Sequence, residues 1–312
     1  MKFLAIAVAL LAPPCVGAGC SGKADARPAV IDTAELTKRA ARLQQALTNP
    51  DADSAHAGRL ARWLLPDQLK EISGLALTSD GRLLTHGVRR GRVFEIDYRR
   101  GMIVKEFSLG RGSDALTGNF EGITVVNDVV YLMSNEGKLY EFREGKDGKK
   151  VDYIMHDTGL KTECEFEGVA FARSINSLLL ACKQVFNKHL KDSLVIFRWK
   201  LEGDSATRAS RLTLPLTKAI GTNNWKGLHP SDITVEPFNG NYVLIAATEK
   251  ALIEITPAGD VVSTRPIPGD HPHAEGVAIT KDSLLIISDE AGHRTPDEAV
   301  HRPAVVTLYR WQ

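Results

Sequence analysis

Three glutamates and two serines recur at matching places in the chain, and together their side chains could bind a cation. Glu121, Glu167 and Glu275 are each followed by a glycine and then by an apolar residue, and Ser73 and Ser231 occupy the same place in similar phrases. Successive positions lie 48, 46, 64 and 44 residues apart. Self-similarity at roughly this spacing is typical of β-propellers, in which one repeat forms one four-stranded blade.

The residue types at these five positions predict a site for a hard cation. Three carboxylates that converge repel one another, so either some are protonated or a cation neutralises them. Calcium accepts many oxygen ligands in flexible geometry, whereas magnesium requires a strict octahedron and zinc prefers nitrogen or sulfur. We therefore predict calcium, with these metal ligands: Ser73, Glu121, Glu167, Ser231 and Glu275. Two alternatives stay open, another cation or a hydrated channel whose glutamates accept hydrogen bonds from backbone amides.

The elements that must position these residues are short strands. From about residue 57 polar and apolar residues alternate, and each repeat contains a strand that begins at the recurring Ser or Glu, followed by further strands. The fifth repeat supplies only three strands, and the segment 59–65 can supply the fourth and close the ring. We predict an all-β fold, a five-bladed β-propeller of four-stranded blades that is closed by an N-terminal strand and preceded by one short helix.

The long loops of this propeller are expected on one face, at the starts of the innermost strands. We term it the long-loop face and the opposite one the short-turn face. The long segments are 110–119, 184–192, 217–230, 269–273 and 291–303. Because long loops on a rigid scaffold often carry function, we place the binding site there.

Polar residues at strand ends and in loops of the long-loop face could form the wall of a pocket for a small anionic ligand. The residues are His86, Arg89, Glu136, Lys183, Glu249, Lys250, Asp289 and Glu290. A cation beside the arginine and the lysines could hold a phosphate or carboxylate. The alternative for each is a solvated loop charge. Three further histidines on this face, His229, His271 and His273, lack zinc-type spacing and are expected to be ordinary loop residues.

The N-terminus predicts export. Lys2 is followed by an apolar run and small residues before Cys20, and the run is too short to cross a bilayer. We divide the chain into a signal peptide (1–19), a lipoprotein tether (20–32), a helix and linker (33–57) and the propeller (58–312). Lipidation of Cys20 would anchor the protein in the bacterial cell envelope, facing the periplasm, with the outer membrane favoured. The alternative is ordinary cleavage and a soluble periplasmic protein.

Composition and cysteines narrow the possibilities. The chain of 312 residues carries 39 Lys plus Arg against 38 Asp plus Glu, which argues against bulk binding to nucleic acid or to an anionic membrane surface. Export permits a disulfide between Cys164 and Cys182. Regular strand pairing would place Cys182 opposite Glu167, about three residues out of register with Cys164, so the sequence favours two buried free thiols.

Several phrases resemble a known family. Those at 71–76, 166–170 leading to 178–183, and 273–278 leading to 287–292 resemble the SdiA-regulated (YjiK-type) propeller family over about residues 58–312. The resemblance implies an exported or membrane-attached propeller. The chain departs from the family at 85–88, where an acidic turn is usual. The order Ser, Glu, Glu, Ser, Glu also resembles the calcium-activated nucleotidases (apyrases), which implies calcium at the five recurring positions.

Together these expectations describe an exported envelope lipoprotein with an axial calcium site, which binds a small anionic ligand or an envelope protein on its long-loop face. The alternative is a calcium-dependent hydrolase of phosphate esters or nucleotides that uses the same ion. The sequence lacks the serine-elbow, phosphate-loop and zinc-protease motifs, so nucleophilic catalysis has no visible signature. Whether the protein is an enzyme stays open at this stage.

Overall fold

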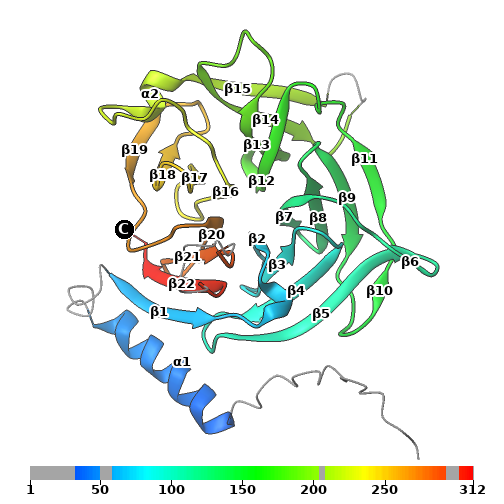
Figure 1. Cartoon of the computed structure of the whole chain (residues 1–312), viewed down its shortest axis with the longest axis vertical. Helices are drawn as coiled ribbons and strands as arrows, with labels where there is room; N and C mark the ends of the chain where they lie inside the picture. The colour runs from blue at the N-terminus through cyan, green and yellow to red at the C-terminus, as the bar shows by residue number, and fades with distance from the viewer. Residues whose placement is uncertain (1–31, 50–57, 204–207, 293–301, 312) are drawn as a thin grey trace, which may run out of the picture. The chain divides into compact units, whose positions relative to one another are not determined.

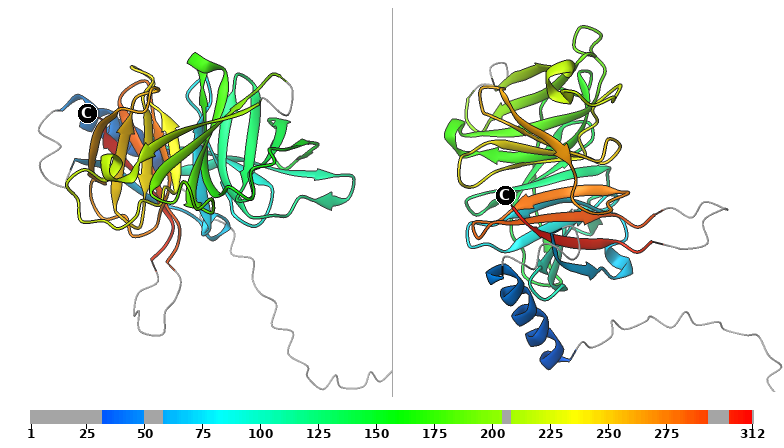
Figure 2. Two further views of the ribbon diagram at one scale, coloured as in Figure 1. Left: turned by 90° about the horizontal axis from the view of Figure 1, so that it is seen from above. Right: turned by 90° about the vertical axis from the view of Figure 1, so that its left-hand side faces the viewer.

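The computed structural model describes residues 32–49, 58–203, 208–292 and 302–311, and within them the strands form five blades around a central axis (Figure 1). The innermost strands, β2, β7, β12, β16 and β20, surround the centre of the ring. The two side views show the twisted blades packed against one another (Figure 2). The predicted five-bladed propeller is confirmed.

Each blade is a four-stranded antiparallel sheet. Blade 1 contains β2 (Ile72–Leu77), β3 (Leu83–Gly87), β4 (Arg92–Asp97) and β5 (Met102–Arg111). Blade 2 contains β7 (Phe120–Val126), β8 (Val129–Ser134), β9 (Lys138–Arg143) and β11 (Ile154–Asp157). Blade 3 contains β12 (Cys164–Ala172), β13 (Ser177–Val185), β14 (Ser193–Lys200) and β15 (Ala209–Pro215). Blade 4 contains β16 (Asp232–Val235), β17 (Tyr242–Ala246), β18 (Ala251–Ile255) and β19 (Val261–Pro266).

Blade 5 joins the two ends of the propeller. It contains β20 (Ala274–Ile279), β21 (Leu284–Asp289), β22 (Val305–Arg310) and, as its outermost strand, β1 (Arg59–Leu64). β1 pairs antiparallel with β22, as the sequence predicted, so hydrogen bonds close the ring. Two short strands, β6 (Asp114–Ala115) and β10 (Lys150–Val151), extend the outer edge of blade 1 by pairing with β5.

The helix α1 (Thr33–Thr48) precedes the propeller, as predicted. Its N-terminus is capped by Asp32, whose carboxylate accepts a hydrogen bond from the backbone N–H of Ala34 at 3.1 Å. Leu43 is buried in the apolar cluster between blades 5 and 1, and Arg310 of β22 donates to the carbonyl of Leu47. The helix is thus packed on the flank of the ring.

Five clusters of buried apolar side chains hold the blades together, one between each pair of neighbours. Successive side chains of a strand point to opposite faces of its blade, so they enter the two apolar clusters on either side of that blade in turn. The helix α2 (Leu216–Ile220) and the short 3-10 turns Asp67–Leu69 and Arg173–Ile175 lie in the connections between strands.

Candidate functional site

The five residues of the predicted cation site lie where the inner strands begin. Ser73, Glu121, Glu167 and Glu275 lie near the starts of β2, β7, β12 and β20, and Ser231 directly precedes β16. The pairing register shifts at this place in β2, β7, β12 and β20, so each of these strands is irregular beside its ring residue. Such breaks in strand pairing, of which β-bulges are the usual form, redirect side chains and are frequent beside functional sites. We term these five residues the polar ring; Glu275 is half-buried and the other four are buried.

The residue after each member of the polar ring stands where neighbouring inner strands touch. Four of these five residues are glycine and the fifth is Asp232. A Cβ added at Gly122 would lie 2.8 Å from the backbone nitrogen of Val169, and one at Gly168 would lie 2.6 Å from the Cα of Asp232. At these glycines the close approach of the inner strands explains the recurrence, because an added Cβ would collide with the neighbouring strand.

Asp232 is the exception to the glycine pattern, and it ties three blades together. Its side chain is fully buried, and its Oδ2 accepts hydrogen bonds from the backbone N–H groups of Val277 in blade 5 at 2.9 Å and Leu75 in blade 1 at 3.4 Å. Its Oδ1 has no hydrogen-bond partner among the described residues. Burial raises the pKa of this carboxyl well above its usual range, although the backbone amides oppose the rise. The sequence did not single out Asp232 as a functional residue, although its place in an otherwise glycine position was a signal.

The three glutamates of the polar ring share one electrostatic environment. Burial raises the pKa of Glu121 to about 8, and the charge of Glu167 adds to the rise. Burial likewise raises the pKa of Glu167 to about 7 and that of Glu275 to about 9. Glu167 and Glu290 also raise the pKa of Glu275. These shifts mean that the site disfavours three bare carboxylates and would gain from a positive charge.

Lys183 supplies part of that positive charge. Its ammonium group donates a hydrogen bond to Oε1 of Glu167, and its charge lowers the pKa of all three glutamates. Oε2 of Glu167 is buried and has no partner among the described residues. The negative charges of Glu290 and Glu165 raise the pKa of Glu121 and of Glu167, in opposition to Lys183. Glu165, two residues before Glu167 on β12, was also missed by the sequence analysis.

The carboxylates do not form a ready-made coordination sphere. Among the described residues, no group of three or more histidine, cysteine, aspartate or glutamate side chains lies close enough to hold a metal ion. The donors of the polar ring are nevertheless all oxygens, mostly buried, and include an unpartnered carboxylate oxygen on Glu167. By donor chemistry they suit a hard cation such as calcium, with some approach of the side chains to the ion.

The predicted wall residues separate into distinct environments. Lys183 and Glu290 act on the polar ring, as described above. Arg89 and Lys250 are exposed, and Glu136 pairs with Lys138 at 2.7 Å. His86 is fully buried, and burial lowers its pKa to about 4.

The last two wall residues are bonded to histidines. Glu249 lies 2.8 Å from Nδ1 of His229, and Asp289 lies 2.6 Å from Nδ1 of His271. Nε2 of His271 contacts the hydroxyl of Tyr309 at 2.8 Å, and the histidine is buried. His271 is thus not the ordinary loop histidine that the sequence predicted, because it fastens the connection before β20 to blade 5.

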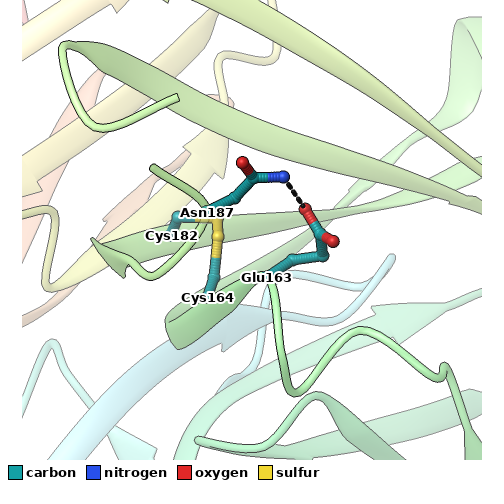
Figure 3. The surroundings of a disulfide bond; sticks show 4 residues. All are labelled: Glu163, Cys164, Cys182 and Asn187. Carbon is teal, nitrogen blue, oxygen red and sulfur yellow. Dashed lines mark hydrogen bonds between the residues drawn. A yellow bond between two sulfur atoms is a disulfide. The ribbon is translucent and has the colours of Figure 1, made fainter. Parts of the chain in front are cut away.

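The two cysteines of the propeller form a disulfide, so the prediction of free thiols was wrong (Figure 3). The Cα atoms of Cys164 and Cys182 lie 5.5 Å apart. The two cysteines are not register partners, because Cys164 pairs with Val185 and Cys182 pairs with Phe166. Two register shifts between Glu165 and Val169 interrupt the regular pairing beside the disulfide, and no sequence pattern indicated them. Beside the disulfide, the amide of Asn187 donates to Glu163 at 3.0 Å (Figure 3). The bond joins the two strands that carry Glu167 and Lys183.

A cavity of about 1120 Å³ opens at the other end of the axis, on the short-turn face. It is lined by residues from the inner strands of all five blades and reaches inward to Leu75, Val169 and Ile233. The polar ring does not line it. The channel therefore has two chemically different ends, whereas the sequence had directed attention only to the long-loop face.

Comparison with known proteins supports the fold. Neither a protein-family profile nor a curated protein sequence matches this chain. The structure is similar to Myxococcus xanthus glutaminyl cyclase, with 13% identity, a TM-score of 0.50 and coverage of 81% of this chain and 97% of that one. The PQQ-bound aldose sugar dehydrogenase of Streptomyces coelicolor is similar with 14% identity, a TM-score of 0.49 and coverage of 80% and 98%. The sheet topology itself defines the β-propeller, and at such low identity the likeness to glutaminyl cyclase concerns the fold alone.

The predicted leader and lipidation site lie outside the described residues. The signal peptide (1–19), Cys20 and the tether up to residue 31 are in that part of the chain. Within residues 32–311 where the structure describes them, no helix is long and apolar enough to cross a membrane. The envelope localisation stays a prediction.

Proposed function

We propose that this protein is a calcium-binding propeller that holds a small anionic ligand or a protein partner at the polar ring. The observation that supports this most directly is the burial of Glu121 and Glu167 and the partial burial of Glu275 on the inner strands, in electrostatic contact with the ammonium group of Lys183. Burial of several carboxylates beside a single ammonium group is costly, and a divalent cation would offset that cost. Calcium would be held by the glutamate carboxylates, with Ser73 and Ser231 close to it in the ring.

The bound ion would supply positive charge for an anionic ligand at the long-loop mouth. Lys183 would then act on the same ligand, because its ammonium group already lies beside Glu167. Glu290 would limit the site to ligands that leave room for its carboxylate. Arg89 and Lys250 are exposed and would contribute through long-range attraction.

We place this propeller, as the resemblance to the SdiA-regulated family implies, in the bacterial envelope with Cys20 lipidated. The hydrolase alternative, in which the ion would polarise the phosphoryl group and activate water, stays a second proposal. A panel of phosphate esters and nucleotides tests it. Phosphate release that requires calcium and is lost in Glu167→Gln would establish hydrolysis; no turnover by a calcium-loaded protein would leave binding as the function.

Calcium binding itself is tested by titration calorimetry on chelator-treated protein. The wild-type protein should bind one calcium ion and melt at a higher temperature when loaded. Glu167→Gln and Glu275→Gln should weaken binding, while Glu202→Gln, an exposed glutamate outside the ring, should not. Absence of both heat and melting shift in the wild-type protein would show that the polar ring is not a calcium site.

A further inference from the structure

The short-turn end of the channel is surrounded by a second ring, which is apolar. Its members stand four residues after each member of the polar ring on the same inner strands, and all line the cavity. They are Leu77, Val125, Phe171, Val235 and Ile279. Ile279 is buried and the other four are half-buried. We term this set the apolar ring. Its side chains are partly exposed in a concave site, which is typical of small-molecule pockets.

The acidic residues that line the cavity are already bonded within the protein. Asp80 accepts hydrogen bonds from Thr78 and Arg82, and Asp282 pairs with Arg99. Glu236 is buried, and its Oε2 accepts from backbone N–H groups at 3.0 and 2.7 Å. These acids therefore have little capacity left for a cationic ligand.

Two cationic residues that line the cavity are not engaged in this way. Arg173, at the turn of blade 3, and Lys281, at the turn of blade 5, are both exposed. Neither has a carboxylate within ion-pair distance among the described residues, whereas the third lining cation, Arg99, is paired with Asp282. The unpaired charge at this mouth is thus positive. It would attract an anionic group.

The neighbouring turns add exposed apolar surface. Ile175 is 38% exposed in the turn that contains Arg173, and Phe238 is 59% exposed in the turn that follows Glu236. Both turns contribute residues to the cavity lining. Such surface beside an apolar concavity favours a ligand with an apolar body over a bare inorganic anion.

We propose that the short-turn mouth binds a small organic anion with an apolar body, such as an aromatic carboxylate. The body contacts the apolar ring, and the carboxylate lies at the rim near Arg173 or Lys281. This site is independent of the polar ring, because the layer of touching inner strands and the side chain of Asp232 lie between the two ends of the axis. It needs no calcium.

The test measures binding of 2-naphthoate to the full chain by titration calorimetry, with its uncharged amide and acetate as comparisons. The wild-type protein should bind naphthoate more tightly than the amide, and acetate not at all. The double variant Arg173→Gln/Lys281→Gln should raise the Kd for naphthoate by about fivefold and leave the amide unchanged, as expected for loss of exposed ion pairs. Lys188→Gln, an exposed lysine on the long-loop face, is the matched control.

A second double variant tests the apolar ring. Val125→Thr/Val235→Thr keeps the side-chain shape and should weaken naphthoate and the amide alike, with circular dichroism unchanged. Three outcomes would overturn the proposal: no binding of naphthoate at millimolar concentration, equal binding by the Arg173→Gln/Lys281→Gln variant, or loss of binding in Glu167→Gln. The last outcome would place the ligand at the polar ring. Because calcium binding is measured separately, failure of the proposal for the short-turn mouth is distinguishable from failure of the proposal for the polar ring.

Discussion

Calcium binding to the polar ring should release protons, and the structure sets the expected number. The pKa values of Glu121, Glu167 and Glu275 are raised to about 8, 7 and 9. At pH 7 a carboxyl with a pKa of about 9 is almost fully protonated, one of about 8 is about nine-tenths protonated, and one of about 7 is about half protonated. The three together therefore carry more than two protons, and a calcium ion that binds carboxylates displaces about two of them. Because the groups interact, this number belongs to the cluster and not to each residue.

The assay is calorimetry of chelator-treated protein at pH 7 in two buffers, PIPES and Tris, that differ in ionisation enthalpy. The difference in observed heat gives the number of protons released. Glu275→Gln removes the group that is most completely protonated and should lower this number by about one. Glu202→Gln, which changes an exposed glutamate, should leave it unchanged.

The same linkage predicts that calcium affinity rises with pH between about 6.5 and 8.5, because fewer protons then have to be displaced. Release of less than about half a proton at pH 7, together with an affinity that does not depend on pH, would refute the reasoning. In that case the glutamates would be ionised before calcium arrives, and their burial would not be the force that favours the ion.

Four further predictions concern stability and affinity. The folded pKa values of about 7 to 9 lie above the usual 4.5, so the folded state binds more protons at these three glutamates. Their contribution to the stability of the metal-free protein is fully present below pH 4.5 and is lost as the pH rises to 9, by about 1 kcal/mol or more per pH unit; urea unfolding should show this loss between pH 6 and 9, and calcium should suppress it. Lys183→Gln should tighten calcium binding by about tenfold in calorimetry, because the substitution removes a positive charge that repels the calcium ion and competes with it for Glu167. Weaker binding would mean that Lys183 positions Glu167 for the ion instead. The pair Cys164→Ser/Cys182→Ser should lower the free energy of unfolding by about 3 kcal/mol, and an unchanged urea midpoint would count against a formed disulfide. Gly122→Ala should lower the free energy of unfolding by about 2 kcal/mol, because the added Cβ would collide with blade 3. Gly87→Ala should be nearly neutral, because its added Cβ would meet only a carbonyl oxygen at 3.6 Å. Equal melting temperatures of the two variants would contradict the close contact between the inner strands.

Much of the fold could be predicted because its signals are local and repeated. Alternation of polar and apolar residues predicts strands, and the spacing of the recurring Ser and Glu gives the number of blades. The fifth repeat lacked a fourth strand, and the segment 59–65 was predicted to supply it. In the structure β1 pairs with β22 and completes blade 5. The placement of the polar ring on the inner strands followed from the same repeat.

Other features depended on contacts that no local pattern reveals. The disulfide joins two residues that are not register partners, in an irregular part of β12, and regular pairing had argued against it. The burial of His271 between Asp289 and Tyr309 required segments far apart in the sequence to meet. Which of the predicted wall residues act on the polar ring was likewise decided by packing, because a strand end can direct its side chain toward the axis, a neighbouring blade or solvent.

The sequence by itself thus determined the number of blades, the closure of the ring and the position of the Ser and Glu residues, because each depends on a repeated short-range pattern. Only the tertiary structure decided what surrounds those residues. It placed Asp232 across the axis, in a position where the other blades have glycine, and it opened a cavity lined by apolar residues at the opposite end. The physical reason is that burial and charge at the axis depend on all five inner strands at once, and these strands meet only when the ring closes.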